Sequence, residues 1–158
     1  MNNQLIHKWT SLITIFSFLL FFTISCEESK NYDEIDQLII EQYIADNNLN
    51  ATATSSGLYY VIDVEGTGAQ PTQSDNVTVG YKGYLNDGTV FDQTQGLNSI
   101  SFSLQSVIDG WKEGIPKFKE GGSGILLIPS RLGYGNQQVG SIPRNSVLIF
   151  DVRLVAVK

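Results

Sequence analysis

The clearest structural pattern in the chain is VTVGYKGYLNDGTVFD, residues 77–92. Apolar side chains alternate with polar or small ones along its first half, and this period of two is typical of a half-buried β-strand. The apolar positions are Val77, Val79, Tyr81 and Leu85. Asn86-Asp87-Gly88 is a turn sequence, and Thr89–Asp92 follows it as a second strand. The stretch therefore predicts two strands joined by a tight turn.

Further strands and one short helix are predicted outside this stretch. The predicted strands are Leu58–Val64, Ile100–Leu104, Gly124–Ile128 and Ser146–Val157. The helical spacing involves Val107, Ile108, Trp111 and Ile115. A single short helix cannot provide the crossovers that a parallel sheet needs. We therefore expect an α+β fold, with an antiparallel sheet of five or six strands and a helix across one face.

Composition excludes several classes of function. The chain has 158 residues, enough for one domain with appendages, and its net charge of −6 disfavours a nucleic-acid partner. Cys26 is the only cysteine and His7 the only histidine, so an intrachain disulfide and a Cys/His metal cluster are excluded. If the N-terminus is removed, no histidine remains for a Ser-His-Asp or Cys-His catalytic set.

Residues 1–25 have the pattern of an export signal. Lys8 is followed by an apolar run, Leu12–Ile24, which is shorter than the roughly 20 residues of a comfortable bilayer span. Thr23-Ile24-Ser25-Cys26 resembles a bacterial lipoprotein cleavage box, although Thr23 replaces the usual Leu, Val or Ile. This resemblance implies lipidation of Cys26. An ordinary signal peptide or a short anchor helix is the alternative.

By the same resemblance, Glu27 in place of aspartate favours the outer membrane. We therefore expect a lipid-anchored protein of the cell envelope, facing the periplasm or the cell surface. The acidic pair Glu27-Glu28 resembles a surface-export signal in some bacterial groups, but it is equally consistent with a solvated charge pair.

Residues 26–56 are predicted to be an anchor and linker that precede the domain at 57–158. Apolar residues at helical spacing, with acidic residues at the start, predict an amphipathic helix over 33–47. This helix could pack on the domain, join a dimer or act as a spacer. Asn47–Ser56 is rich in Asn, Thr and Ser, and we expect a linker there.

Four motifs follow one another in residues 79–152. They are Tyr81-x-Gly-x-Leu-x-Asp-Gly-x-x-Phe-Asp92, Val107–Gly114, Gly133-Tyr134-Gly135 with Ile142-Pro143, and Leu148–Val152. In this order they resemble the FKBP-type peptidyl-prolyl cis–trans isomerases. The resemblance implies a bent antiparallel sheet wrapped around a short helix, with an apolar pocket that promotes rotation about Xaa-Pro peptide bonds.

The resemblance also implies roles for individual residues. The implied catalytic residues are Tyr81, Asp92, Phe102, Ile108, Trp111 and Tyr134. The implied substrate-binding residues are Phe91, Val107, Ile142 and Phe150. Trp111 would form the pocket floor, and Asp92, Tyr134 and the backbone N–H of Ile108 would be the polar contacts. The implied partners are proline-containing polypeptides and macrolide inhibitors of the family, and no cofactor or metal is implied.

Simpler interpretations of these residues exist. Tyr81, Phe102 and Trp111 would be core residues on periodicity alone, and Asp92 would be a turn cap. Tyr134 lies between two glycines, which is more typical of a loop that holds an aromatic side chain in place.

The chain also departs from the family pattern at the pocket rim. Gln93-Thr94 replaces a frequent Ser-Ser, Gln138 replaces a histidine of some members, and Ser141 replaces an apolar residue. These departures concern substrate preference and macrolide affinity more than basic activity.

Three functions follow from these patterns. The first is an isomerase that accelerates the folding of exported proteins. The chain also resembles isomerase lipoproteins that are associated with gliding motility in some bacteria. The second is a module that binds proline-containing segments with little turnover. The third is a structural envelope protein, which would not bind proline peptides.

Overall fold

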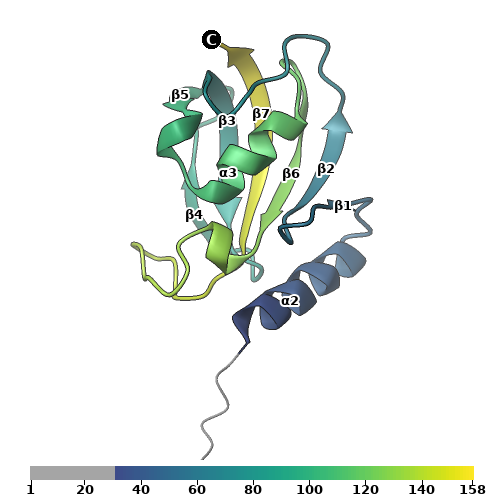
Figure 1. Cartoon of the computed structure of the whole chain (residues 1–158), viewed down its shortest axis with the longest axis vertical. Coiled ribbons are helices and arrows are strands. Elements are labelled where there is room, and N and C mark those ends of the chain that lie inside the picture. The colour runs from purple at the N-terminus through teal and green to yellow at the C-terminus, as the bar shows by residue number, and fades with distance from the viewer. Residues whose placement is uncertain (1–30) are drawn as a thin grey trace, which may run out of the picture. The chain divides into compact units, whose positions relative to one another are not determined.

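Seven strands form one antiparallel sheet in the computed structural model, which describes residues 31–158 (Figure 1). The strands are β1 (Thr52–Ala53), β2 (Tyr59–Val64), β3 (Asn76–Tyr84), β4 (Val90–Gln93), β5 (Ile100–Ser103), β6 (Ser123–Ile128) and β7 (Leu148–Val157). Their order is β1-β2-β6-β7-β3-β4, and β5 also pairs with β3. The predicted antiparallel α+β fold is confirmed, with one strand more than expected because β1 was missed.

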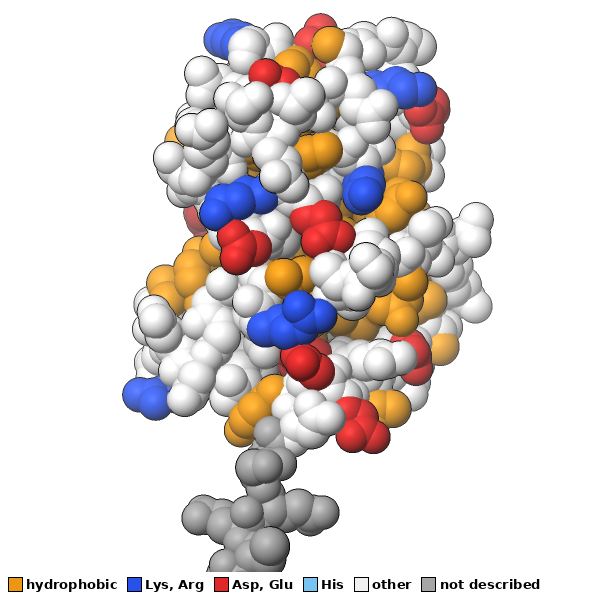
Figure 2. Space-filling model, in the orientation of Figure 1, with side chains coloured by type: hydrophobic (Ala, Val, Ile, Leu, Met, Phe, Trp, Pro, Cys, Tyr) orange, Lys and Arg blue, Asp and Glu red, His pale blue; other side chains and the backbone are white. Residues whose placement is uncertain are grey.

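The helices are α2 (Tyr32–Asp46) and α3 (Asp109–Gly114), and residues 31–158 also contain three 3₁₀ turns. The turns are η1 (Leu104–Ser106), η2 (Ile115–Lys117) and η3 (Ser130–Leu132). Within residues 31–158, no helix is both long enough and apolar enough to cross a membrane. Figure 2 shows acidic and basic side chains interspersed on the face seen in Figure 1.

Helix α3 lies across one face of the sheet and closes the main core (Figure 1). Two glycines allow its close approach to β6. A Cβ on Gly110 would lie 2.4 Å from Cγ2 of Ile128, and one on Gly114 would lie 2.7 Å from Cδ2 of Leu126. Gly110 and Gly114 are one helical turn apart, so they form one face of α3 without side chains. The helix backbone can therefore pack directly against the strand.

Helix α2 covers part of the opposite face of the sheet. Side chains alternate between faces along a strand, and in β6 Leu126 and Ile128 belong to the main core while Leu127 belongs to a second cluster. The second cluster contains Ile40, Tyr84, Leu127, Val147 and Ile149, all buried. Of the alternatives for this helix, packing on the domain is therefore the one observed.

Tyr84 shows how closely α2 is joined to the sheet. Alternation places this residue on the polar face of β3, yet only 9% of it is exposed. Its hydroxyl donates a hydrogen bond to Oδ1 of Asp151 at 2.9 Å and lies 3.2 Å from the hydroxyl of Tyr43. A buried hydroxyl needs such partners, and here α2 and β7 each supply one.

The segment Asn47–Ser56, predicted as a linker, is partly paired with the sheet and packed against it. Thr52 and Ala53 form β1 and pair with Tyr60 and Tyr59, while Leu49 packs against the second cluster. Backbone hydrogen bonds to a strand offset the polarity that suggested a solvated segment. The predictions for the signal at 1–25 and for Cys26 lie outside the described residues.

Candidate active site

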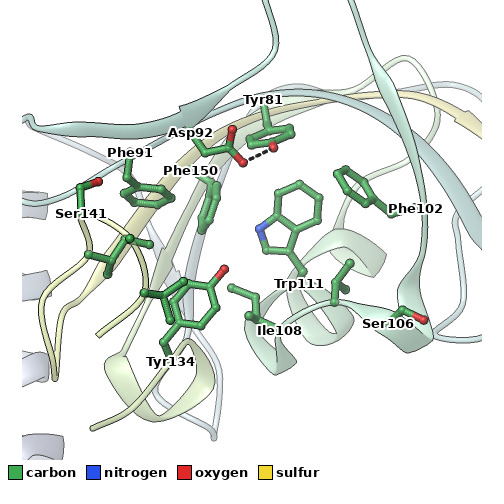
Figure 3. Close-up of a pocket in the computed structure, with 14 residues that line it drawn as sticks. Tyr81, Phe91, Asp92, Phe102, Ser106, Ile108, Trp111, Tyr134, Ser141 and Phe150 are labelled. Carbon is green, nitrogen blue, oxygen red and sulfur yellow. Dashed lines mark hydrogen bonds between the residues drawn. The ribbon is translucent and has the colours of Figure 1, made fainter. Parts of the chain in front are cut away.

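A pocket of roughly 610 Å³ opens between α3, the sheet and the segment after η3 (Figure 3). All ten residues assigned to it by family resemblance line it. They are Tyr81, Phe91, Asp92, Phe102, Val107, Ile108, Trp111, Tyr134, Ile142 and Phe150. The structure therefore brings together side chains from four strands, one helix and one loop, while their individual roles stay predictions.

Aromatic rings form the floor and walls of the pocket. Trp111 is only 4% exposed, and its ring packs nearly perpendicular to its aromatic neighbours. The centroid distances from Trp111 are 5.2 Å to Tyr81, 5.5 Å to Phe102 and 5.3 Å to Phe150. Edge-to-face packing of this kind stabilises aromatic pairs beyond the area that they bury. The rings therefore hold one another in place and leave a rigid apolar surface.

The space for Phe91 and Phe150 depends on a glycine in β3. A Cβ on Gly83 would lie 2.5 Å from Cε2 of Phe91 and 2.8 Å from Cε1 of Phe150. The two rings themselves pack edge to face with centroids 5.5 Å apart. Gly83 thus allows both rings to lie directly against the strand backbone.

One polar pair stands at the edge of this apolar surface. The hydroxyl of Tyr81 donates a hydrogen bond of 2.5 Å to Oδ2 of the exposed Asp92 (Figure 3). Burial, followed by this bond and the charge of Asp92, raises the pKa of the Tyr81 phenol above its ordinary value of 10.0. The phenol therefore stays protonated near neutral pH and remains a donor. Asp92 keeps further acceptor capacity for an N–H donor of a bound molecule.

The opposite edge of the pocket comes from the pocket loop, residues 130–145. The carbonyl oxygen of Ser130 accepts the N–H of Gly133 at 3.0 Å and of Gly135 at 2.8 Å, on either side of Tyr134. Gly135 has a φ of +55°, a conformation in which glycine avoids the strain of other residues. The backbone of the loop therefore fixes the position from which Tyr134 reaches the pocket.

Four lining residues were missed by the sequence reasoning: Ser106, Val139, Gly140 and Ser141. The last three belong to the pocket loop, where Val139 and Ile142 form an isolated bridge. Ser141 was noticed only as a departure from the family pattern. The positions of Tyr134 and Ile142 on either side could have indicated them, because a tight loop brings intervening residues to the same rim.

The pocket offers apolar surface with few polar groups. Within residues 31–158, no group of three or more His, Cys, Asp or Glu side chains is placed to hold a metal ion. The combination of aromatic walls and a small number of oriented polar groups is typical of a binding site for a small, mostly apolar group.

Comparisons with known proteins support the resemblance that the motifs indicated. A family model described as FKBP-type peptidyl-prolyl cis-trans isomerase matches residues 67–155. The chain is 42% identical over 132 residues to a probable isomerase FkpA of Neisseria meningitidis, covering 82% of this chain and 48% of that protein. It is 48% identical over 107 residues to FkpA of Escherichia coli K12, covering 66% and 39%.

Two solved structures of isomerases are similar to this chain. The crystal structure of FkpA from Escherichia coli has a TM-score of 0.70 at 33% identity, covering all of this chain and 74% of that one. A peptidyl-prolyl isomerase from Pseudomonas syringae has a TM-score of 0.68 at 30% identity, covering 79% and 95%. The chain spans less than half the length of the curated relatives that it matches. With the motifs, the fold and the family model in agreement, the chain belongs to the FKBP-type peptidyl-prolyl cis–trans isomerase family.

Proposed function

We propose that this chain is a peptidyl-prolyl cis–trans isomerase that accelerates rotation about Xaa-Pro bonds during the folding of exported proteins. The observation that carries the proposal is the pocket itself, in which Trp111 forms an aromatic floor and Tyr81 and Asp92 form a polar edge. Family membership supports the same reaction class.

The geometry suits a reaction in which no covalent bond breaks. The barrier to rotation is about 18–20 kcal/mol because the planar amide loses resonance when it twists. A twisted amide is less polar at its carbonyl, so transfer from water into an apolar pocket favours the twisted form. Catalysis requires this preference for the twisted form over both planar isomers. The aromatic walls supply the apolar surroundings and a surface for the proline ring.

The test is the cis-to-trans rate of short Xaa-Pro peptides with and without the purified 158-residue chain. Phe102→Ala and Asp92→Ala should each lower kcat/KM by about tenfold or more, because each removes one wall or one polar edge of the pocket. Ile100→Ala and Val90→Ala are matched controls on β5 and β4, since both side chains are exposed and lie outside the pocket.

The enzyme proposal would be contradicted if the folded wild-type chain accelerated none of a series of peptides that differ in the residue before proline. Peptide binding without acceleration would identify a module that binds proline-containing segments. A macrolide of the kind that inhibits this family should compete with the peptide for the pocket, and its affinity would show the effect of Ser141 at the rim.

We also propose that a lipid on Cys26 anchors the chain to the outer membrane, where it faces the periplasm or the cell surface. Only the sequence supports this, through the apolar run that ends at Ser25-Cys26. Cys26→Ser should release the protein from the membrane fraction and abolish the mass increment of a lipid. An unchanged membrane fraction and mass would contradict the proposal. An association with gliding motility stays a prediction.

A further inference from the structure

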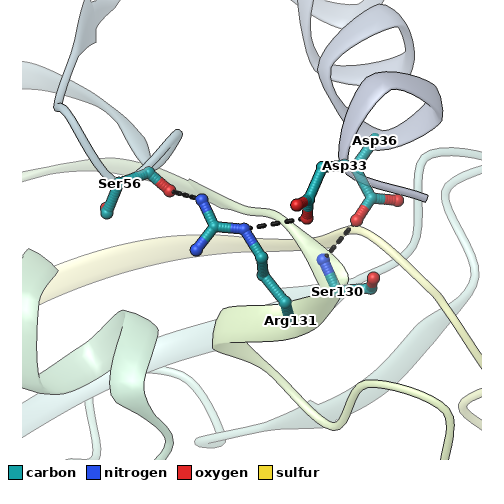
Figure 4. A network of polar contacts seen from close by, with 5 residues as sticks. All are labelled: Asp33, Asp36, Ser56, Ser130 and Arg131. Carbon is teal, nitrogen blue, oxygen red and sulfur yellow. Dashed lines mark hydrogen bonds and ion pairs between the residues drawn. The ribbon is translucent and has the colours of Figure 1, made fainter. Parts of the chain in front are cut away.

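A buried carboxylate joins α2 to the pocket loop. Asp36 lies in the second turn of α2 and is fully buried, and its Oδ2 accepts the backbone N–H of Ser130 at 2.7 Å (Figure 4). The two residues are 94 positions apart in the chain. Ser130 is the first residue of η3 and of the pocket loop, so the contact fixes the point at which the loop leaves β6.

A second contact beside it joins the same two elements. Nε of Arg131 lies 2.9 Å from Oδ1 of Asp33 in the first turn of α2, and the guanidinium also donates to the carbonyl oxygen of Ser56 (Figure 4). This ion pair is largely exposed, and pairs of that kind contribute little on their own. We therefore assign the main restraint to Asp36.

The restraint reaches the pocket through Ser130. Its N–H is held by Asp36, and its carbonyl oxygen accepts the N–H groups of Gly133 and Gly135, which flank Tyr134. The carbonyl oxygen of Gly135 in turn accepts the N–H of Asn145 at 2.8 Å and closes the loop. Two successive hydrogen bonds thus connect α2 with the backbone on either side of a pocket residue.

Stability alone does not account for this aspartate. Burying a carboxylate is costly unless its oxygens are well paired. Oδ1 of Asp36 is buried and makes no hydrogen bond to residues 31–158. An apolar side chain at this site would avoid that cost but could not hold the N–H of Ser130.

We propose that α2 is a positioning element of the active site and that Asp36 is the positioning residue that keeps the pocket loop in its binding-competent conformation. The proposal rests on the proposed isomerase function. Without the restraint, the loop populates other conformations. The apparent affinity for the peptide then falls in proportion to the fraction of molecules whose loop is in the binding-competent conformation. A bound peptide still selects the competent loop, so KM rises while kcat changes little.

The test compares variants of the 158-residue chain by peptide kinetics and by amide hydrogen exchange. Asp36→Leu removes the acceptor and should raise KM about tenfold, with kcat within about twofold, since a hydrogen bond to a charged group is among the stronger ones. Exchange at Gly133 and Gly135 should accelerate by about the same factor, while amides of β7 stay protected. Asp36→Asn retains an acceptor oxygen and should restore most of both.

Two more variants keep the test decisive. Val61 is a buried residue of β2 outside the pocket, so Val61→Ala should lower thermal stability and leave KM unchanged. Arg131→Met keeps an exposed side chain of similar length, should fold even where Asp36→Leu does not, and should raise KM about twofold through loss of the contacts to Asp33 and Ser56.

Unchanged KM and exchange in Asp36→Leu would overturn the proposal, as would an equal rise of KM in Val61→Ala. If Asp36→Leu does not fold, unchanged KM and unchanged exchange at Gly133 and Gly135 in Arg131→Met would overturn the assignment of α2 as a positioning element. Failure of the proposed function is a separate outcome, because it would appear as a wild-type chain without isomerase activity. The exchange of Gly133 and Gly135 would then still report whether Asp36 positions the loop.

Discussion

At the residue scale, polar atoms are placed where two elements meet. Tyr81 and Asp92 join β3 to β4 at the pocket edge, and Tyr84 joins β3 to β7 and α2 on the other face of the sheet. Both phenols have a raised pKa, and burial is the largest cause for each. Each hydroxyl therefore acts as a neutral donor, and its role depends on keeping its proton.

Tyr84 gives a pH dependence whose sign can be worked out. Burial, then hydrogen bonds with Tyr43 and Asp151, raises its pKa above the ordinary value of 10.0. The folded state therefore binds this proton more tightly than the unfolded state. The resulting stability is fully present below pH 10 and is lost as the pH rises through the folded pKa.

We expect the wild-type chain to exceed Tyr84→Phe in free energy of unfolding by a constant amount below about pH 9, and by a shrinking amount above about pH 10. Urea unfolding of both proteins from pH 8 to 11 measures this difference, and lysine titration cancels between them. A difference that grows above pH 10 would show that the phenol is not held in its neutral form.

At the element scale, α3 positions the pocket floor because it packs directly on β6. Gly110 and Gly114 face Ile128 and Leu126, and Trp111 lies between them in the chain, towards the pocket. In the sequence, both glycines are simply members of the Val107–Gly114 motif. In the structure they are the reason why the helix can approach the sheet, since any side chain there would push it outward.

Gly110→Ala tests this packing. The added Cβ would lie 2.4 Å from Cγ2 of Ile128, so α3 or β6 must shift. Overpacking of this kind costs about 1–3 kcal/mol, partly offset by the better helix propensity of alanine. We also expect kcat/KM to fall at least about tenfold, because Trp111 moves with the helix.

Lys112→Ala is the matched control on the same helix. Its side chain is partly exposed and forms an ion pair with Asp109, so its loss should cost no more than about 1 kcal/mol. Chemical denaturation and the peptide assay check both variants. Equal stability and activity for Gly110→Ala and wild type would show that α3 has room to spare above β6.

At the scale of the described molecule, α2 belongs to the same compact unit as the sheet. Residues 31–158 form a single compact unit, and Ile40 of α2 is completely buried against Leu127 and Ile149. The sheet thus has two covered faces, with α3 and the pocket on one and α2 on the other. A change in α2 should therefore affect the stability of the whole unit.

Ile40→Ala should lower the free energy of unfolding by about 2–5 kcal/mol, because it leaves a cavity in the second cluster. Leu38→Ala removes a side chain of similar size from the same helix, but Leu38 is 62% exposed and the change should stay within about 0.5 kcal/mol. Near-UV and far-UV circular dichroism should follow one transition in both variants. A separate early transition in Ile40→Ala would show that α2 unfolds independently.

Six of the seven strands and helix α3 could be predicted from periodicity and turn sequences, and the family resemblance supplied ten of the pocket residues. Their signals are local: alternation along β3 and β7, a turn at Asn86-Asp87-Gly88, and motifs in a fixed order. Such patterns report which residues share a face of one element, and the family resemblance added which faces form a pocket.

The positions of α2 and of residues 47–56 could not be predicted from the sequence, because they depend on tertiary contacts. The burial of Tyr84, the pairing of β1 with β2 and the contact from Asp36 to Ser130 each depend on residues far apart in the chain. A polar residue in a periodic pattern is expected to face water, and nothing local shows that another element will cover it. The position of α2 over the sheet, and with it the link to the pocket loop, follows from how the separate apolar faces fit together in three dimensions.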